Sequence, residues 1–332
     1  LDRITVTTDF NDLAECDLII EAVFENREIK ADVTQKTEAV ISEDTVFASN
    51  TSTLPITGLA ESSSRPEGFI GMHFFSPVER MPLVEIILGK ETSDRALAVA
   101  LDYVQQIRKT PIVVNDSRGF FTSRVFSTAC NEANTMLMEG VSPALIENAA
   151  RHAGYPVGPL AVQDETSIEL GYKIHLQTIE DMGDAYKPAS GWKVAEKLVE
   201  QDRLGKKYGK GFYDYPEGAK KRLWSGLAEM FPVSDEQPDV EEVKSRLMTI
   251  QALDAYRCLE ENVLMSPDDG DIGSILGWGF PPWAGGVFSY IDTVGVPEFV
   301  ATCDDYCDRL GERFTVPDSL REKAEKGEKF YP

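Results

Sequence analysis

Short β-branched runs alternate with helical stretches along residues 1–113, and this alternation limits the fold more than any other feature of the sequence. The predicted strands are 4–8, 17–23, 45–48 and 112–114, and the predicted helices are 9–15, 28–41 and 93–109. Such alternation is typical of a doubly wound α/β sheet, in which ligands bind at the carboxyl ends of the strands. We therefore expect functional residues directly after the strands, at 25–26 and 49–53.

The segment Gly71–Ile87 predicts a β-hairpin. Two X-Pro pairs near its middle cannot continue a strand ladder, so the chain is expected to fold back around Glu79. This register pairs 71 with 87, 73 with 85 and 75 with 83, and it sets His73 beside Glu85 on one face. An imidazole held by a carboxylate is a typical general base near neutral pH. A core histidine next to a glutamate is the alternative, and the spacing alone leaves both open.

From residue 116 onward the pattern is helical, with helices predicted over 119–140 and 142–153 and a linker over 231–240. Gly154-Tyr-Pro156 recurs as Gly279-Phe-Pro281, and each copy precedes a small-residue turn and an acidic residue, Asp292 in the second. We interpret this echo as two related helical units, roughly 116–222 and 241–332, with chance similarity of a short motif as the alternative. The predicted domains are 1–115, 116–222 and 223–332.

The composition excludes several classes of partner. The 332 residues include 33 Lys and Arg against 56 Asp and Glu, a net charge of −23, which argues against nucleic acid or an anionic membrane as a bulk partner. No apolar run is long enough to span a bilayer and no secretory signal is visible, so we expect a cytoplasmic protein. The five cysteines lack metal-ligand spacing, which predicts reduced thiols and no metal site.

Six motifs occur in order along the chain: Asp17-Leu-Ile-Ile-Glu-Ala-Val-Phe-Glu-Asn26, Phe47-Ala-Ser-Asn-Thr-Ser52, Gly71-Met-His-Phe-Phe-Ser-Pro77, Leu83-Val-Glu-Ile86, Asp116-Ser-Arg-Gly-Phe120 and Gly154-Tyr-Pro-Val-Gly-Pro159. Together they resemble the L-3-hydroxyacyl-CoA dehydrogenase family. The second helical unit resembles the C-terminal repeat of the multifunctional β-oxidation enzymes, so the resemblance covers essentially the whole chain.

The resemblance implies an α/β Rossmann-type domain, lacking its first βαβ part, followed by two related all-α dehydrogenase C-terminal domains. It implies oxidation of (3S)-3-hydroxyacyl-CoA to 3-oxoacyl-CoA with NAD in fatty-acid β-oxidation, within a larger chain that has an upstream enoyl-CoA hydratase/isomerase domain. An acyl-CoA is then the substrate, a thiolase subunit is a candidate partner, and an oligomer or complex is expected.

Residue roles follow from the motif match. His73 matches the base that takes the proton of the substrate's 3-hydroxyl, and Glu85 matches the partner that orients its imidazole. Ser52 matches the serine near the nicotinamide and the substrate thioester. The alternative for Ser52 is a plain turn residue.

The resemblance also assigns cofactor contacts to Glu25, Lys30 and Lys207. Glu25 and Lys30 have a second interpretation as solvated charges at a helix start. Lys207 belongs to a basic cluster that is unusual in so acidic a chain and is completed by Arg203, Lys206 and Lys210. A solvated basic face is the alternative for this cluster.

The chain departs from the family pattern in three places. The Gly-x-Gly-x-x-Gly turn that lays a pyrophosphate on a helix N-terminus is absent from the sequence, which begins with Leu1 and enters a strand-like segment at once. We therefore expect a fragment that begins within a domain and binds NAD weakly or not at all by itself. Ser76 stands on the nicotinamide side, and Ser123 on the substrate side, where the family has asparagine.

Two other functions remain open. A different β-hydroxyacid dehydrogenase on the same scaffold would act on free hydroxy acids rather than CoA thioesters. A catalytically silent assembly module that docks a thiolase would keep its function after replacement of His73.

Overall fold

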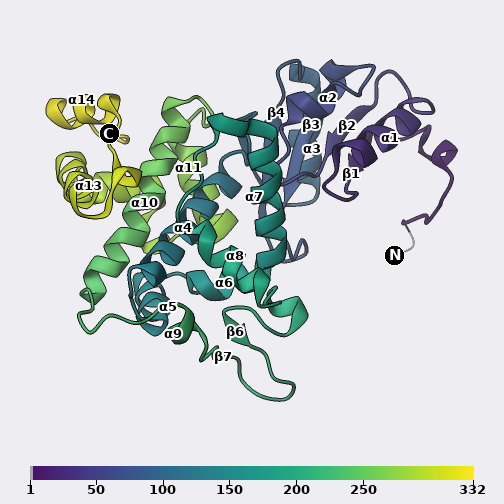
Figure 1. Cartoon of the computed structure of the whole chain (residues 1–332). Helices are drawn as coiled ribbons and strands as arrows, with labels where there is room; N and C mark the ends of the chain where they lie inside the picture. Colours follow the sequence, from purple (N-terminus) through teal and green to yellow (C-terminus); the bar gives the residue numbers. More distant parts are fainter. Residues whose placement is uncertain (1–2) are drawn as a thin grey trace. The chain divides into compact units, whose positions relative to one another are not determined.

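A computed structural model describes residues 3–332, so Leu1, on which the expectation of a fragment partly depends, lies outside the described residues. The chain divides into two compact units (Figure 1). One contains the residues up to Arg124 together with Cys258–Trp278, and the other contains Val125–Arg257 with Gly279–Pro332. Between residues 3 and 332, every helix is too short or too polar to cross a membrane.

A five-stranded sheet organises the first unit. In spatial order its strands are β1 (Leu18–Glu21), β2 (Val46–Ser49), β3 (Phe69–Phe74), β4 (Leu83–Leu88) and β5 (Thr110–Asn115). The first three strands are parallel, β4 is antiparallel to β3, and β5 is parallel to β4. The carboxyl ends of β1, β2 and β3 therefore lie at one edge, which agrees with the predicted α/β architecture.

Helices follow the strands as the alternation predicts. The helices of this unit are α1 (Arg27–Glu38), α2 (Ile56–Ala60), α3 (Asp94–Gln106), α11 (Pro267–Gly273), the 3₁₀ helices η1 (Phe10–Leu13) and η2 (Pro66–Gly68), and a π-helical turn η5 (Ser274–Trp278). Asn26 begins α1 by accepting a hydrogen bond from the N–H of Ile29, and Ser93 caps α3 in the same way.

The predicted strand at 4–8 is wrong. These residues form no strand, and Ile4 and Val6 are 67% and 91% exposed. β-branched residues favour a strand only where they can pair with a neighbouring strand and pack on an apolar surface. Within the described residues β1 pairs only with β2, so residues 4–8 have no strand partner. The helix expected over 9–15 is a short 3₁₀ helix capped by Asp9.

Residues of the hairpin alternate between the two faces of the sheet. Met72 and Ile86 belong to an apolar cluster that includes residues of α3. His73 and Glu85 point to the opposite face, because successive strand residues alternate in direction. The catalytic candidates are thus separated from this cluster by the sheet itself.

The second unit is mostly helical, and α4 enters it from the first unit. Its helices are α4 (Thr122–Met138), α5 (Pro143–Ala153), α6 (Pro159–Thr166), α7 (Ile168–Met182), α8 (Trp192–Glu200), α9 (Leu227–Met230), α10 (Val240–Glu260), α12 (Val287–Val294), α13 (Val296–Leu310) and α14 (Asp318–Lys326), with 3₁₀ helices η3 (Gly183–Ala185), η4 (Lys206–Tyr208), η6 (Pro282–Ala284) and η7 (Glu312–Phe314). A small hairpin of β6 (Tyr213–Asp214) and β7 (Arg222–Leu223) was not predicted.

The two halves of the helical sequence share a pattern of hydrogen bonds. The carboxylate of Asp164 accepts hydrogen bonds from the N–H groups of Phe212 and Tyr213. The carboxylate of Asp292 accepts the same pair of bonds from a second Phe-Tyr dipeptide, Phe330-Tyr331. Each half therefore fixes a Phe-Tyr segment with an acidic residue that follows its Gly-x-Pro turn.

Candidate active site

The hairpin has the register that the sequence predicts. Gly71 pairs with Ile87 and His73 pairs with Glu85, while Phe75 lies just beyond the end of β3. Nδ1 of His73 lies 2.9 Å from Oε2 of Glu85, and both side chains are buried. The two residues expected to form a catalytic pair are therefore in direct contact.

The Glu85 carboxylate is also bound by the first residues of α4. Its Oε1 accepts hydrogen bonds from the N–H groups of Phe121 and Thr122, each at 3.0 Å, and its Oε2 accepts one from Oγ1 of Thr122 at 2.6 Å. A helix N-terminus stabilises negative charge through its unpaired N–H groups and dipole. These donors hold the Glu85 side chain, which is 0% exposed, in one orientation and satisfy its oxygens.

This arrangement determines the tautomer of His73. A carboxylate accepts hydrogen bonds, so in the neutral form of the imidazole Nδ1 carries the proton and Nε2 has the lone pair. The imidazole packs against the rings of Phe75, 4.4 Å away between centroids, and Phe120 at 6.2 Å. A neutral imidazole with a free Nε2, oriented by a buried carboxylate, is suited to take a proton from a bound molecule.

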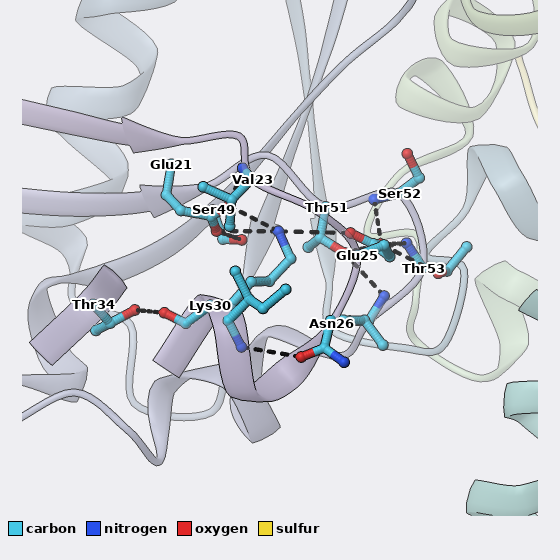
Figure 2. A network of polar contacts seen from close by, with 12 residues as sticks. Glu21, Val23, Glu25, Asn26, Lys30, Thr34, Ser49, Thr51, Ser52 and Thr53 are labelled. Carbon is cyan, nitrogen blue, oxygen red and sulfur yellow. Dashed lines mark hydrogen bonds and ion pairs between the residues drawn. The ribbon is translucent and has the colours of Figure 1, made fainter. Parts of the chain in front are cut away.

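Glu25 organises the segment that follows β2 (Figure 2). Its Oε1 accepts hydrogen bonds from Oγ1 of Thr51 at 2.5 Å, from the N–H of Ser52 at 3.2 Å and from the N–H of Thr53 at 3.3 Å. The residues after β1 and β2 are thus joined, as expected for the carboxyl edge of a parallel sheet. Ser52 itself is exposed there.

Lys30 is not a solvated charge. Its side chain is 2% exposed, and Nζ lies 2.9 Å from Oε1 of Glu21, which is equally buried. The same Glu21 carboxylate accepts hydrogen bonds from Oγ of Ser49 and from the N–H of Val23 (Figure 2). Nζ is also 3.6 Å from Oε2 of Glu25, so the ammonium of Lys30 contacts both carboxylates at this edge of the sheet.

The serines that replace expected asparagines lie in the same unit as His73. Ser123 is partly buried in the first turn of α4, and Ser76 is exposed immediately before the cis peptide bond to Pro77. Lys207 lies in the other unit, exposed on η4.

Carboxylates accompany three of the four residues of the predicted basic cluster. Arg203 is buried and its Nη2 lies 2.6 Å from Oδ1 of Asp214. Lys206 and Lys210 pair with Glu165 and Asp202 at 3.3 and 2.8 Å. Charge balance within an acidic chain explains this outcome, since nearby carboxylates neutralise the cations. Among the described residues, Lys207 is the member of the cluster with no ion pair.

Sequence reasoning missed three residues that shape the site. Thr122 binds Glu85 directly. Asp116 accepts hydrogen bonds from the N–H groups of Ile56 and Thr57 at 2.8 Å and so fixes the start of α2. Asn50 accepts a hydrogen bond from the N–H of Phe74 beside His73. Asp116 and Asn50 stand inside two of the six motifs, and Thr122 lies two residues after the end of one, so their position was the available signal.

Comparison with known proteins identifies the family to which the chain belongs. The model of the 3-hydroxyacyl-CoA dehydrogenase NAD binding domain matches residues 1–117, and that of the C-terminal domain of the same family matches residues 119–215. The (S)-3-hydroxybutyryl-CoA dehydrogenase of Ralstonia eutropha is 36% identical with a TM-score of 0.59, over 64% of this chain and 75% of that one. The chain therefore belongs to the 3-hydroxyacyl-CoA dehydrogenase family.

Other similar proteins extend the match across the chain. The alpha subunit of the fatty acid oxidation complex of Shewanella loihica is 41% identical over 98% of this chain, which spans about half, 46%, of that relative. The dehydrogenase part of multifunctional enzyme 1 from Caenorhabditis elegans is 25% identical, with a TM-score of 0.65 over 96% of this chain and 74% of that one. The 3-hydroxybutyryl-CoA dehydrogenase of Escherichia coli, 23% identical, shares the fold with a TM-score of 0.80 over 97% of this chain and 84% of that one.

Proposed function

We propose that this chain catalyses the oxidation of (3S)-3-hydroxyacyl-CoA to 3-oxoacyl-CoA in fatty-acid β-oxidation, with NAD as hydride acceptor. The observation that carries this proposal is the buried contact of 2.9 Å between Nδ1 of His73 and Oε2 of Glu85. His73 lies next to the last residue of β3, and β3 ends at the same edge as β1 and β2, which Glu25 and Ser52 follow.

His73 removes the proton in this reaction. Its Nε2 takes the proton from the substrate's 3-hydroxyl as the C3–O bond becomes a carbonyl, and the electron pair of the C3–H bond leaves as hydride. NAD, when bound, supplies the acceptor for that hydride. The imidazolium that forms on His73 is stabilised by the Glu85 carboxylate, which Thr122 and Phe121 hold in place.

The residues at the carboxyl edge of the sheet fit the nicotinamide part of the cofactor. Ser52 is exposed there, and the Glu25 side chain is 25% exposed while its position is fixed by hydrogen bonds, so both would hold the nicotinamide side. Ser76 is a further contact on that side. Lys30 contributes through Glu25, since its ammonium is engaged by Glu21. No Gly-x-Gly-x-x-Gly turn for the pyrophosphate occurs in the sequence.

Two further contacts complete the proposed site. Ser123, in the first turn of α4, donates to the substrate's carbonyl in place of the longer asparagine. Lys207 is exposed and lacks an ion pair among the described residues, and the motif match is what supports it as a contact for an anionic group of the cofactor.

We also infer the wider setting of the chain. The relatives named as alpha subunits of the fatty acid oxidation complex are about twice as long, which leaves room for a further domain. From the resemblance to the multifunctional β-oxidation enzymes, we infer that this domain would be an enoyl-CoA hydratase/isomerase and that the whole protein would act in the cytoplasm with a thiolase subunit. The paired fixation of Phe-Tyr segments by Asp164 and Asp292 supports 116–222 and 223–332 as two related helical domains after 1–115.

The experiment compares substrates in the full-length protein. NADH oxidation is followed with acetoacetyl-CoA, and separately with free acetoacetate at matched concentration. The proposal predicts turnover of the thioester at a kcat/KM at least 100-fold above that of the free acid. Equal use of both compounds would support the rival β-hydroxyacid dehydrogenase, and no turnover of either would support the assembly module.

A further inference from the structure

A π-helical turn from late in the sequence packs against residues that neighbour the His73–Glu85 pair. The turn, η5 (Ser274–Trp278), directly continues α11 and belongs to the same compact unit as the hairpin. π-Helical turns are rare and often occur at functional sites. Residues 267–278 lie in the predicted second helical domain, yet they pack against β5 and against β4, the strand that carries Glu85.

Two glycines bring this segment close to its neighbours. A Cβ atom at Gly273 would lie 2.8 Å from Cδ1 of Ile112 and 3.0 Å from Cε1 of Phe121. A Cβ atom at Gly277 would lie 3.1 Å from Cδ2 of Leu83 and 3.4 Å from Cγ2 of Thr122. The two glycines are four residues apart, so they share one face of the helical segment.

The four residues nearest to this face adjoin Glu85. Ile112 is the partner of Glu85 in the pairing of β4 with β5, and Leu83 precedes Glu85 by two residues on the same face of β4. Phe121 and Thr122 donate the hydrogen bonds that hold the carboxylate.

Aromatic contacts extend the packing to both ends of the catalytic pair. The ring of Trp278 packs edge-on against Phe121, with centroids 5.3 Å apart. Phe75, which packs on the imidazole of His73, has its Cε1 3.8 Å from the Cβ position of Gly277. The turn therefore contacts residues on the Glu85 side and on the His73 side.

The start of this segment is anchored to β5. The N–H of Asn115 donates to the carbonyl of Val263 at 2.9 Å, and Nδ2 of Asn115 donates to the carbonyl of Asn262 at 2.7 Å. These bonds join the chain just before α11 to the end of β5. The segment is therefore fixed at its start by hydrogen bonds and at its end by the packing of Trp278.

We propose that Gly277 and Trp278 are positioning residues of the dehydrogenase, because their close packing holds the N-terminus of α4 against Glu85 and so orients His73. The inference rests on the proposed function. A displacement of about 1 Å in a catalytic group can lower a rate about 100-fold, so a side chain at Gly277 has a measurable effect. The second helical domain thereby contributes to catalysis without supplying a residue that touches the substrate.

The test uses Gly277→Val and the milder Gly277→Ala in the full-length protein, with acetoacetyl-CoA and NADH. We expect kcat to fall at least 10-fold in Gly277→Val and less in Gly277→Ala, with KM for both substrates within about 3-fold of wild type and a shifted pH profile of kcat/KM. Leu83→Val, which shortens the side chain nearest to the new atoms, should restore part of the loss in Gly277→Ala. Gly58→Ala is the control, because a Cβ there meets no atom within 4 Å.

A second measurement is independent of turnover. The proton on Nδ1 of His73, held between the imidazole and Glu85, gives an NMR resonance that we expect to shift or broaden in Gly277→Ala and in Trp278→Leu, and to stay unchanged in Gly58→Ala. Unchanged kcat, pH profile and resonance in folded Gly277→Ala would overturn the positioning role. Loss of kcat without a change in profile or resonance, and without rescue by Leu83→Val, would also overturn it. If wild type lacks activity but the resonance shifts, the proposed function fails while the positioning of His73 stands.

Discussion

Oε2 of Glu85 lies 2.9 Å from Nδ1 of His73 and 2.6 Å from Oγ1 of Thr122, so one carboxylate oxygen joins the imidazole to the first turn of α4. The pairing of β3 with β4 brings the two residues together, and the helix N-terminus supplies the remaining donors. Among residues 3–332, no Lys or Arg pairs with this carboxylate, which is unusual for a buried charge, and these donors satisfy it instead.

Glu85→Gln should lower kcat at least ~100-fold with little change in KM. The neutral amide stabilises the imidazolium of His73 poorly, and it cannot accept all the hydrogen bonds that Phe121, Thr122 and His73 donate to the carboxylate. Steady-state kinetics of acetoacetyl-CoA reduction measures the effect. Glu79→Gln is the control, since Glu79 is 74% exposed on the hairpin loop. A kcat of Glu85→Gln within 3-fold of wild type would show that the carboxylate is not needed for proton transfer.

Lys30→Met should lower the free energy of unfolding by about 3–5 kcal/mol, because it leaves the Glu21 carboxylate buried without its cation. Urea denaturation provides the measurement. Lys36→Met on the same helix removes an exposed pair with Asp32 and should cost at most about 1 kcal/mol. Equal effects of the two changes would mean that burial of the Lys30–Glu21 pair has no energetic consequence.

Lowering the pH should destabilise the helical unit through His175. Burial lowers the pKa of His175, whose ring stacks on Trp192 at 4.4 Å and whose Nδ1 lies 3.1 Å from the Tyr186 hydroxyl. Its pKa in the folded state is below the unfolded value of about 6.5, so the unfolded chain binds the proton more readily. The stabilising contribution is present above pH ~6.5 and is lost as the pH falls toward the folded pKa.

The measurement is the free energy of unfolding from pH 7.5 to pH 5. His175→Gln should flatten its decline, whereas the exposed His152→Gln should leave the slope as in wild type. An identical slope in the His175 variant would assign the pH dependence to other groups.

Local features of the chain could be predicted where neighbouring residues determine them. The hairpin register follows from prolines that force a turn between two apolar runs, and α1 and α3 begin at the polar caps Asn26 and Ser93. The direct contact between His73 and Glu85 followed from that register.

Features that depend on distant residues could not be predicted. The burial of Lys30 depends on Glu21 and on the packing of α1 against the sheet, and the neutralisation of Arg203 depends on Asp214 across a short hairpin that lacked a clear strand signal. The strand expected at 4–8 had suitable residues but no partner among the described strands. The role of Thr122 required knowing that α4 begins beside β4.

The most direct test of the account is the turnover of His73→Gln in the full-length protein, measured as NADH-dependent reduction of acetoacetyl-CoA. Glutamine has nearly the length of histidine but cannot gain a proton near neutral pH, so we expect kcat at least ~100-fold below wild type with an unchanged unfolding transition. A His73→Gln protein that is folded and within a few-fold of the wild-type kcat would contradict His73 as the base.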